Sequence, residues 1–217
     1  MLNFLRNSSV FFLVSLVCAV ATVTSQTTKA METVKGLSLA NIGLMFIFMC
    51  IMGWLALDAH KERPSQQGKE TIAIYGLWGT STLLVGIAIA TNPDYVWCLN
   101  DWYALASGAL GGLAAVAWAI WQHVGFTEAS TKSIFATFCK SVPQLLMAWK
   151  ITEEGGTGHA PLALFVGVVS VSTRLWMLKR QKDAAGSWES NLLWMAGSES
   201  FNLATWLSVC AAWWFYT

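Results

Sequence analysis

Three charged side chains, Lys140, Arg174 and Glu199, stand inside long apolar stretches of the sequence. A charge at the centre of a lipid bilayer costs at least about 2.5–3.5 kcal/mol, so each of them needs a partner or a route to water. Lys140 and Glu199 fall at similar depths, and we expect them to form a buried pair that couples to a proton or a substrate carboxylate. A static pair between helices is the alternative interpretation. Arg174 lies near Lys179, and we expect it to extend to the membrane interface.

Uncharged polar side chains give a second set of candidates. Trp78 and Asn202 occupy comparable places in two apolar segments, and aromatic faces and amides bind polyols or nucleosides well. We therefore predict that both bind substrate, with core packing as the alternative for Trp78. Pro143 removes a backbone donor beside Gln144, which predicts a bend that acts as a hinge. An ordinary membrane kink is the alternative there.

The sequence shows no residue pattern for a metal or cofactor site, for catalysis or for nucleic-acid binding. His60, His123 and His159 stand apart, and the five cysteines form no CxxC pair, so we expect no metal and no cofactor. Paired catalytic carboxylates, a Ser/His/Asp set and a phosphate-binding loop are also missing, which argues against an enzyme. A net charge of +1 without a basic stripe argues against a nucleic-acid partner.

The composition indicates an integral, multi-pass membrane protein whose partner is the lipid bilayer. Hydrophobic residues make up 55% of the 217 residues and charged residues 12%. Since about 20 apolar residues cross a bilayer as a helix, the apolar runs predict an all-α fold of seven transmembrane helices. The predicted spans are 9–27, 38–57, 71–91, 102–122, 133–151, 161–178 and 191–214. The first run also has features of a cleaved signal peptide over residues 1–25.

The two halves of the chain carry related residues, which predicts an internal repeat. Gln26 near the end of the first span corresponds to Gln144 in the fifth, and each is followed by a polar loop and a span that ends in Trp and charge. The repeat predicts two three-helix bundles joined by a linking helix. The predicted boundaries are 1–91, 92–129 and 130–217. Gly108 and Gly112 in the linking span match GxxxG, so we expect close helix packing there.

The sequence resembles the PQ-loop proteins of the SWEET and cystinosin superfamily. The resemblance is carried by Pro143-Gln144, by Ser25-Gln26-Thr27-Thr28-Lys29 and by Lys35-Gly36-Leu37-Ser38-Leu39. The first copy has Ser25 where the family has proline, and the second has Gly155-Gly156-Thr157-Gly158 in place of Gly-Leu-Ser. The resemblance implies a seven-helix carrier for a sugar or amino acid that works by alternating access, with Gln26 and Gln144 at the substrate path.

Two other functions stay open at this point. Trp188, Trp194 and Asn202 resemble the nicotinamide riboside carriers of the PnuC family. A receptor that does not transport, or an accessory subunit of a larger membrane complex or homo-oligomer, is the other alternative, and it predicts that the polar residues pack against each other.

The distribution of Lys and Arg predicts the orientation in the membrane. Eight of them fall on the face that holds the N-terminus, and three, Lys29, Lys35 and Lys150, fall on the other. By the positive-inside rule the N-terminus is cytoplasmic, whereas SWEET-type proteins are usually oriented the other way. The eight residues are Arg6, Lys61, Arg63, Lys69, Lys132, Lys179, Arg180 and Lys182.

Overall fold

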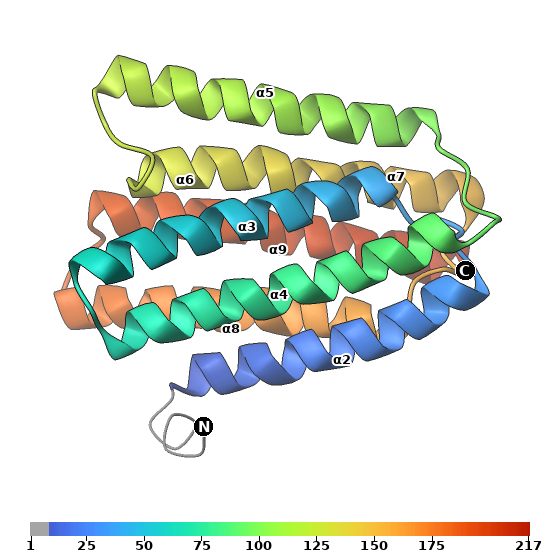
Figure 1. Ribbon diagram of the computed structural model, residues 1–217, viewed down its shortest axis with the longest axis horizontal. Coiled ribbons are helices and arrows are strands. Elements are labelled where there is room, and N and C mark those ends of the chain that lie inside the picture. Colours follow the sequence, from blue (N-terminus) through green and yellow to red (C-terminus); the bar gives the residue numbers. More distant parts are fainter. Residues whose placement is uncertain (1–8) are drawn as a thin grey trace.

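The computed structural model describes residues 9–217, and over this range the chain is helical with no strands. Arg6, which entered the orientation count, lies outside the described residues. The all-α expectation is confirmed (Figure 1). The elements are α2 (Val10–Glu32), α3 (Leu39–Glu62), α4 (Gln66–Thr91), α5 (Leu99–Gln122), α6 (Ala129–Ala136), η1 (Thr137–Ser141), α7 (Val142–Glu154), α8 (Pro161–Ala185) and α9 (Ser190–Tyr216).

Five of these helices are long and apolar enough to cross a membrane: α2, α3, α4, α5 and α8. The helix α6–η1–α7 is interrupted by the π-helical segment η1, and α9 has 27 residues; neither is among these five. Each helix extends beyond the apolar run that predicted it, because polar residues at the ends continue the helix. Serine caps explain several starts: the Ser38 hydroxyl, for example, accepts the backbone N–H of Asn41, which an N-cap requires.

Just before Pro143, where a bend was expected, the helix contains a π-helical turn. The N–H of Val142 donates to the carbonyl of Thr137, five residues earlier. Pro143 lies at the junction of η1 and α7 and has no N–H to donate to the preceding turn; the Phe138 carbonyl, five residues earlier, accepts the Ser107 hydroxyl at 3.3 Å. The wide turn places Lys140 and Ser141 in the interior, 8% and 0% exposed.

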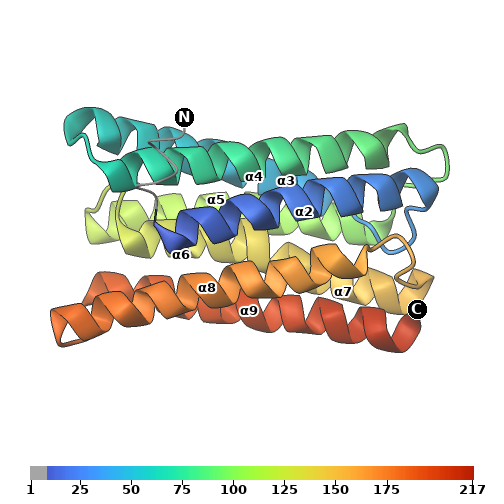
Figure 2. The same cartoon turned by 90° about the horizontal axis from the view of Figure 1, so that it is seen from below.

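The helices lie roughly parallel to the long axis of the molecule, and the two halves of the chain have the same pattern of neighbours (Figures 1 and 2). In the first half, α4 packs against both α2 and α3. In the second half, α9 packs against both α8 and the α6–η1–α7 helix. Helix α5 packs against α3, α6 and α7, and α2 contacts α8 across the halves.

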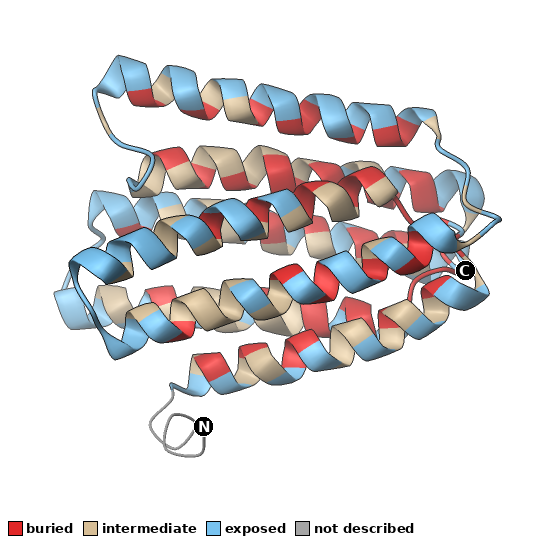
Figure 3. Cartoon of the chain, in the orientation of Figure 1, coloured by how far each residue is buried: buried red, intermediate tan, exposed pale blue. Residues whose placement is uncertain are grey.

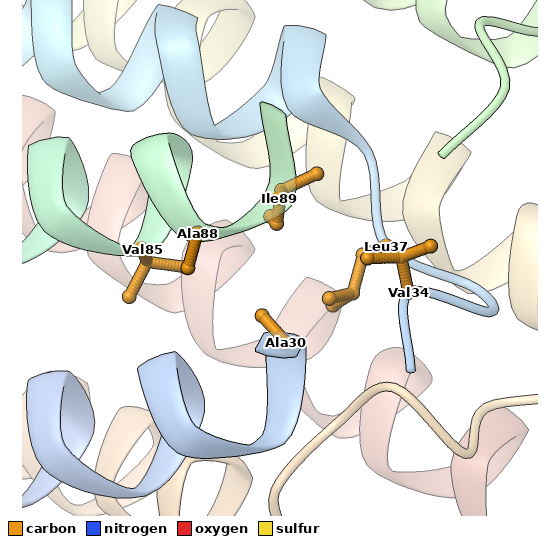
Figure 4. Close-up of a cluster of buried hydrophobic side chains, with 6 residues drawn as sticks. All are labelled: Ala30, Val34, Leu37, Val85, Ala88 and Ile89. Atoms are coloured by element: carbon orange, nitrogen blue, oxygen red, sulfur yellow. The ribbon is translucent and has the colours of Figure 1, made fainter. Parts of the chain in front are cut away.

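The two ends of the bundle differ in packing. At one end, a cluster from α2, α4 and the segment between α2 and α3 fills the interior (Figure 4). Near the opposite end, α3, α8 and α9 expose most of their surface (Figure 3). The core is therefore strongest at the end where α2 finishes and α8 begins. The cluster contains Ala30, Val34, Leu37, Val85, Ala88 and Ile89.

Small residues on α5 permit close packing, but the spacing differs from the GxxxG expectation. A Cβ on Gly108 would collide with the Leu44 side chain of α3, and one on Gly111 would collide with Cβ of Phe138 in η1. A Cβ on Gly112 would meet nothing within 4 Å. The tight contacts are therefore made by Gly108 and Gly111.

The adjacent glycines Gly111 and Gly112 provide a matched test of this packing. We expect Gly111→Ala to destabilise the protein by about 1–3 kcal/mol, because Phe138 and η1 must move. Gly112→Ala should be neutral or slightly stabilising, because alanine is the better helix former. Thermal unfolding in detergent measures both, and equal melting temperatures for the two variants would contradict the contact.

Candidate functional site

A cavity of about 290 Å³ lies between the two halves of the chain. Its walls come from α2, α3 and α4 on one side and from η1, α8 and α9 on the other. It reaches the end of the bundle marked by Phe11, Gln67 and Gln181, where α2 and α4 begin and α8 approaches its end. We call this end the open end and this space the central cavity. Four of the predicted site residues line it: Trp78, Lys140, Glu199 and Asn202.

Lys140 and Glu199 form the pair expected from their depth. The Lys140 Nζ lies 3.2 Å from Oε2 and 3.4 Å from Oε1 of Glu199, and it also lies over the Phe48 ring, 5.6 Å from the centroid. The Asn202 amide donates to Oε2 of Glu199 at 3.0 Å. The pair therefore sits in a lining of aromatic and amide groups, which strengthens its electrostatic attraction relative to water.

Arg174, which was expected to extend to the membrane interface, lines the central cavity. Its guanidinium carbon lies 5.5 Å from the ring centroid of Phe11, at the open end. It also attracts the Glu199 carboxylate through space. The cavity, itself polar, removes the need for an arginine to reach the interface.

A second cavity, of about 70 Å³, lies deeper, beyond Trp78 and Trp206, which line both spaces. Gln26 and Gln144 line this deeper cavity, as does Asn41 of α3. The Gln144 carbonyl oxygen accepts the Thr205 hydroxyl. Within residues 9–217, its Nε2 and the Oδ1 of Asn41 have no hydrogen-bond partner although both residues are 0% exposed. These two atoms are a donor and an acceptor left free for water or a solute.

The far side of the deeper cavity is closed by two interlocked loops, and we call this the closed end. The backbone N–H of Gly158 donates to the Lys35 carbonyl at 3.0 Å, and His159 Nε2 lies 3.1 Å from the Gly36 carbonyl. Gln26 uses both ends of its amide: it donates to the Gly158 carbonyl at 2.8 Å and accepts the Ala160 N–H at 3.0 Å. Gln26 is therefore a tie across the closed end as well as part of the cavity lining.

A buried ion pair beside the closed end was missed in the sequence. Asp101 was assigned to a loop and Lys150 to the charges of one membrane face, but they are 0% and 2% exposed and lie 3.3 Å apart. Asp101 also accepts the Ser38 hydroxyl and the Cys98 N–H. The segment Cys98-Leu99-Asn100-Asp101 did carry a signal for this site. An acidic residue in the third helical position favours a helix start there, which places Asp101 on a helix.

Trp206 was also missed as a candidate. It lines both cavities and packs against α8, where a Cβ on Gly167 would approach its ring to 2.8 Å. Because the chain has thirteen tryptophans, residue type alone does not single out Trp206. Its distinguishing signal is a position one turn beyond Asn202 on the same helix.

Comparison of the chain with protein-family models, with curated proteins and with solved structures gives no match.

His159 gives the closed end a pH dependence. Burial lowers its pKa to about 4, although the hydrogen bond to the Gly36 carbonyl opposes this shift. Because the folded state keeps the ring neutral while the unfolded state takes up a proton below about pH 6.5, stability falls as the pH drops from about 6.5 towards 4. The predicted loss is about 3 kcal/mol.

Melting temperature measured against pH in detergent checks this prediction. His159→Gln should flatten the decline over that window, while His123→Asn at the exposed end of α5 should leave it intact. An unchanged pH profile in His159→Gln would contradict the assignment.

Proposed function

We propose that the protein is an integral membrane carrier that moves a small polar solute, a sugar or an amino acid, by alternating access. The observation that carries the proposal is a cavity between the two halves of the chain that reaches one end of the bundle while hydrogen-bonded loops close the other. A carrier open to one side requires this arrangement. A protein in which the same residues only packed against each other would have no such space.

The repeated pattern of neighbours supports a 3+1+3 arrangement of seven spans. In this arrangement α2, α3 and α4 form one bundle, the α6–η1–α7 helix with α8 and α9 forms the second, and α5 links them. The central helix of each bundle, α4 or α9, contacts its two partners. Solute then binds between the bundles, and rocking of one bundle against the other exposes the site to each side in turn.

The residues of the two cavities have different proposed roles. Trp78, Asn202 and Gln144 contact the solute, Lys140 and Glu199 are the coupling pair, and Pro143 with the π-helical turn is the hinge. When the loops separate, the hydrogen bonds of Gln26 to Gly158 and Ala160 break and the closed end opens. Because Lys61, Arg63 and Lys179 lie at the open end, the positive-inside rule makes this the cytoplasmic side, and the conformation described is then inward-open.

Uptake into proteoliposomes tests the carrier with sugars and amino acids at two pH gradients. We expect Asn202→Ala to lower uptake at least tenfold, because it removes an amide from the cavity wall. Glu199→Gln should remove the dependence on the proton gradient, since the glutamine cannot take up the proton. Glu189→Gln, at the exposed start of α9, is the control and should transport normally.

Each variant must elute as a monodisperse species before its uptake is interpreted, because Lys140 loses its partner in Glu199→Gln. A wild-type protein that is well folded and moves none of these solutes in either gradient would argue against a carrier.

A further inference from the structure

The charges that line the central cavity do not balance. Two cations, Lys140 and Arg174, face a single carboxylate, Glu199, and the other described residues of the lining are uncharged. Glu70, the acidic residue of α4, is not part of this lining; its carboxylate accepts the Ser9 N–H at 3.0 Å and the Ser9 hydroxyl. The cavity therefore carries one surplus positive charge, and an anion of charge −1 neutralises it.

The surplus charge is located at Arg174. Lys140 and Asn202 both contact the Glu199 carboxylate directly, whereas Arg174 forms no ion pair or hydrogen bond with any residue between 9 and 217. The Arg174 guanidinium lies over the face of the Phe11 ring. A guanidinium presents a planar fork of donors whose geometry matches a carboxylate through two parallel hydrogen bonds.

The remaining walls fit an apolar body attached to that carboxylate. Phe48, Tyr75, Trp78 and Trp206 supply aromatic surface, and Met45 and Met49 supply thioethers. The volume of about 290 Å³ is close to the lower end of the range of about 300–1,000 Å³ for small-molecule sites. A phosphate group, with a charge near −2, would exceed the surplus charge.

We propose that the central cavity binds a small organic acid, a monocarboxylate with an apolar or aromatic body, whose carboxylate is held by Arg174. This inference rests on the proposed carrier and gives it an organic acid as solute in place of a sugar or amino acid. Glu199 keeps Lys140 neutralised, so that one anion enters at a time. Trp78 and Trp206 contact the body of the acid at the boundary between the two cavities.

Benzoate and its uncharged isostere benzamide are suitable probes, because they share a ring and differ in charge. Their binding to the full chain is measured by isothermal titration in phosphatidylcholine nanodiscs. These nanodiscs contain no anionic lipid headgroups that could compete for the site. We expect benzoate to bind at least tenfold more tightly than benzamide. Arg174→Gln should weaken benzoate binding at least tenfold, and Arg174→Lys should weaken it less, since it keeps the charge and loses the fork.

Arg180→Gln is the matched control, because Arg180 lies on the same helix, stacks on Trp176 and is not in the cavity lining. It should bind benzoate like the wild type. Equal binding of benzoate and benzamide, benzoate binding that survives Arg174→Gln, or tighter binding of inorganic phosphate than of benzoate would each overturn the proposal.

The experiments distinguish a failure of the organic-acid proposal from a failure of the carrier proposal. Uptake of glucose or alanine by a protein that does not bind benzoate would overturn the organic-acid proposal and leave the carrier standing. Arg174-dependent binding of benzoate without transport of any solute would support the site and overturn the carrier.

Discussion

The carboxylate of Asp101 is the group on which the arrangement of the bundle depends. It is 0% exposed and joins three elements: the Ser38 hydroxyl at the start of α3 donates to it at 2.7 Å, the Cys98 N–H at the start of α5 at 3.1 Å, and Lys150 of α7 at 3.3 Å. A buried charge without partners costs several kcal/mol. Separation of any of these helices is therefore opposed by the exposure of a charge to an apolar interior, and Asp101 holds α3 of the first half against α7 of the second.

The two ends of the bundle are held by different forces. At the closed end, bonds between neutral groups join the loops, such as those of Gln26 with Gly158 and Ala160, and each contributes about 1 kcal/mol net. Such bonds can be exchanged for bonds to water as the loops part. Around the central cavity, the charges of Lys140, Arg174 and Glu199 make part of the lining polar. The loops of the closed end are thus joined by individually weak bonds, while the Asp101–Lys150 pair beside them holds α3, α5 and α7 together.

The sequence was sufficient to predict the helical class, the approximate position of each helix between residues 9 and 217, and the pairing of Lys140 with Glu199. Apolar run length and charge depth, on which these predictions rest, follow directly from the physics of the bilayer. It was insufficient where three-dimensional proximity decides. Asp101 and Lys150 lie at the ends of apolar runs, where the sequence pattern is the same for an exposed charge and a buried one. The place of Arg174 in the cavity lining was missed because a cavity cannot be inferred from one helix. The roles of Trp78 and Asn202 stay predictions, although both line one cavity.

The π-helical turn from Thr137 to Ser141 amounts to one residue more than an α-helix would need. Since each residue of an α-helix turns the chain by about 100°, this additional residue sets the rotation of α6 relative to α7, and with it the direction of Lys140. A related chain shortened by one residue here would keep a continuous helix and its apolar character, yet it would turn Lys140 away from Glu199 or shift all of α6 on its axis. The length of this segment, more than its composition, therefore determines whether the charge of Lys140 faces the cavity.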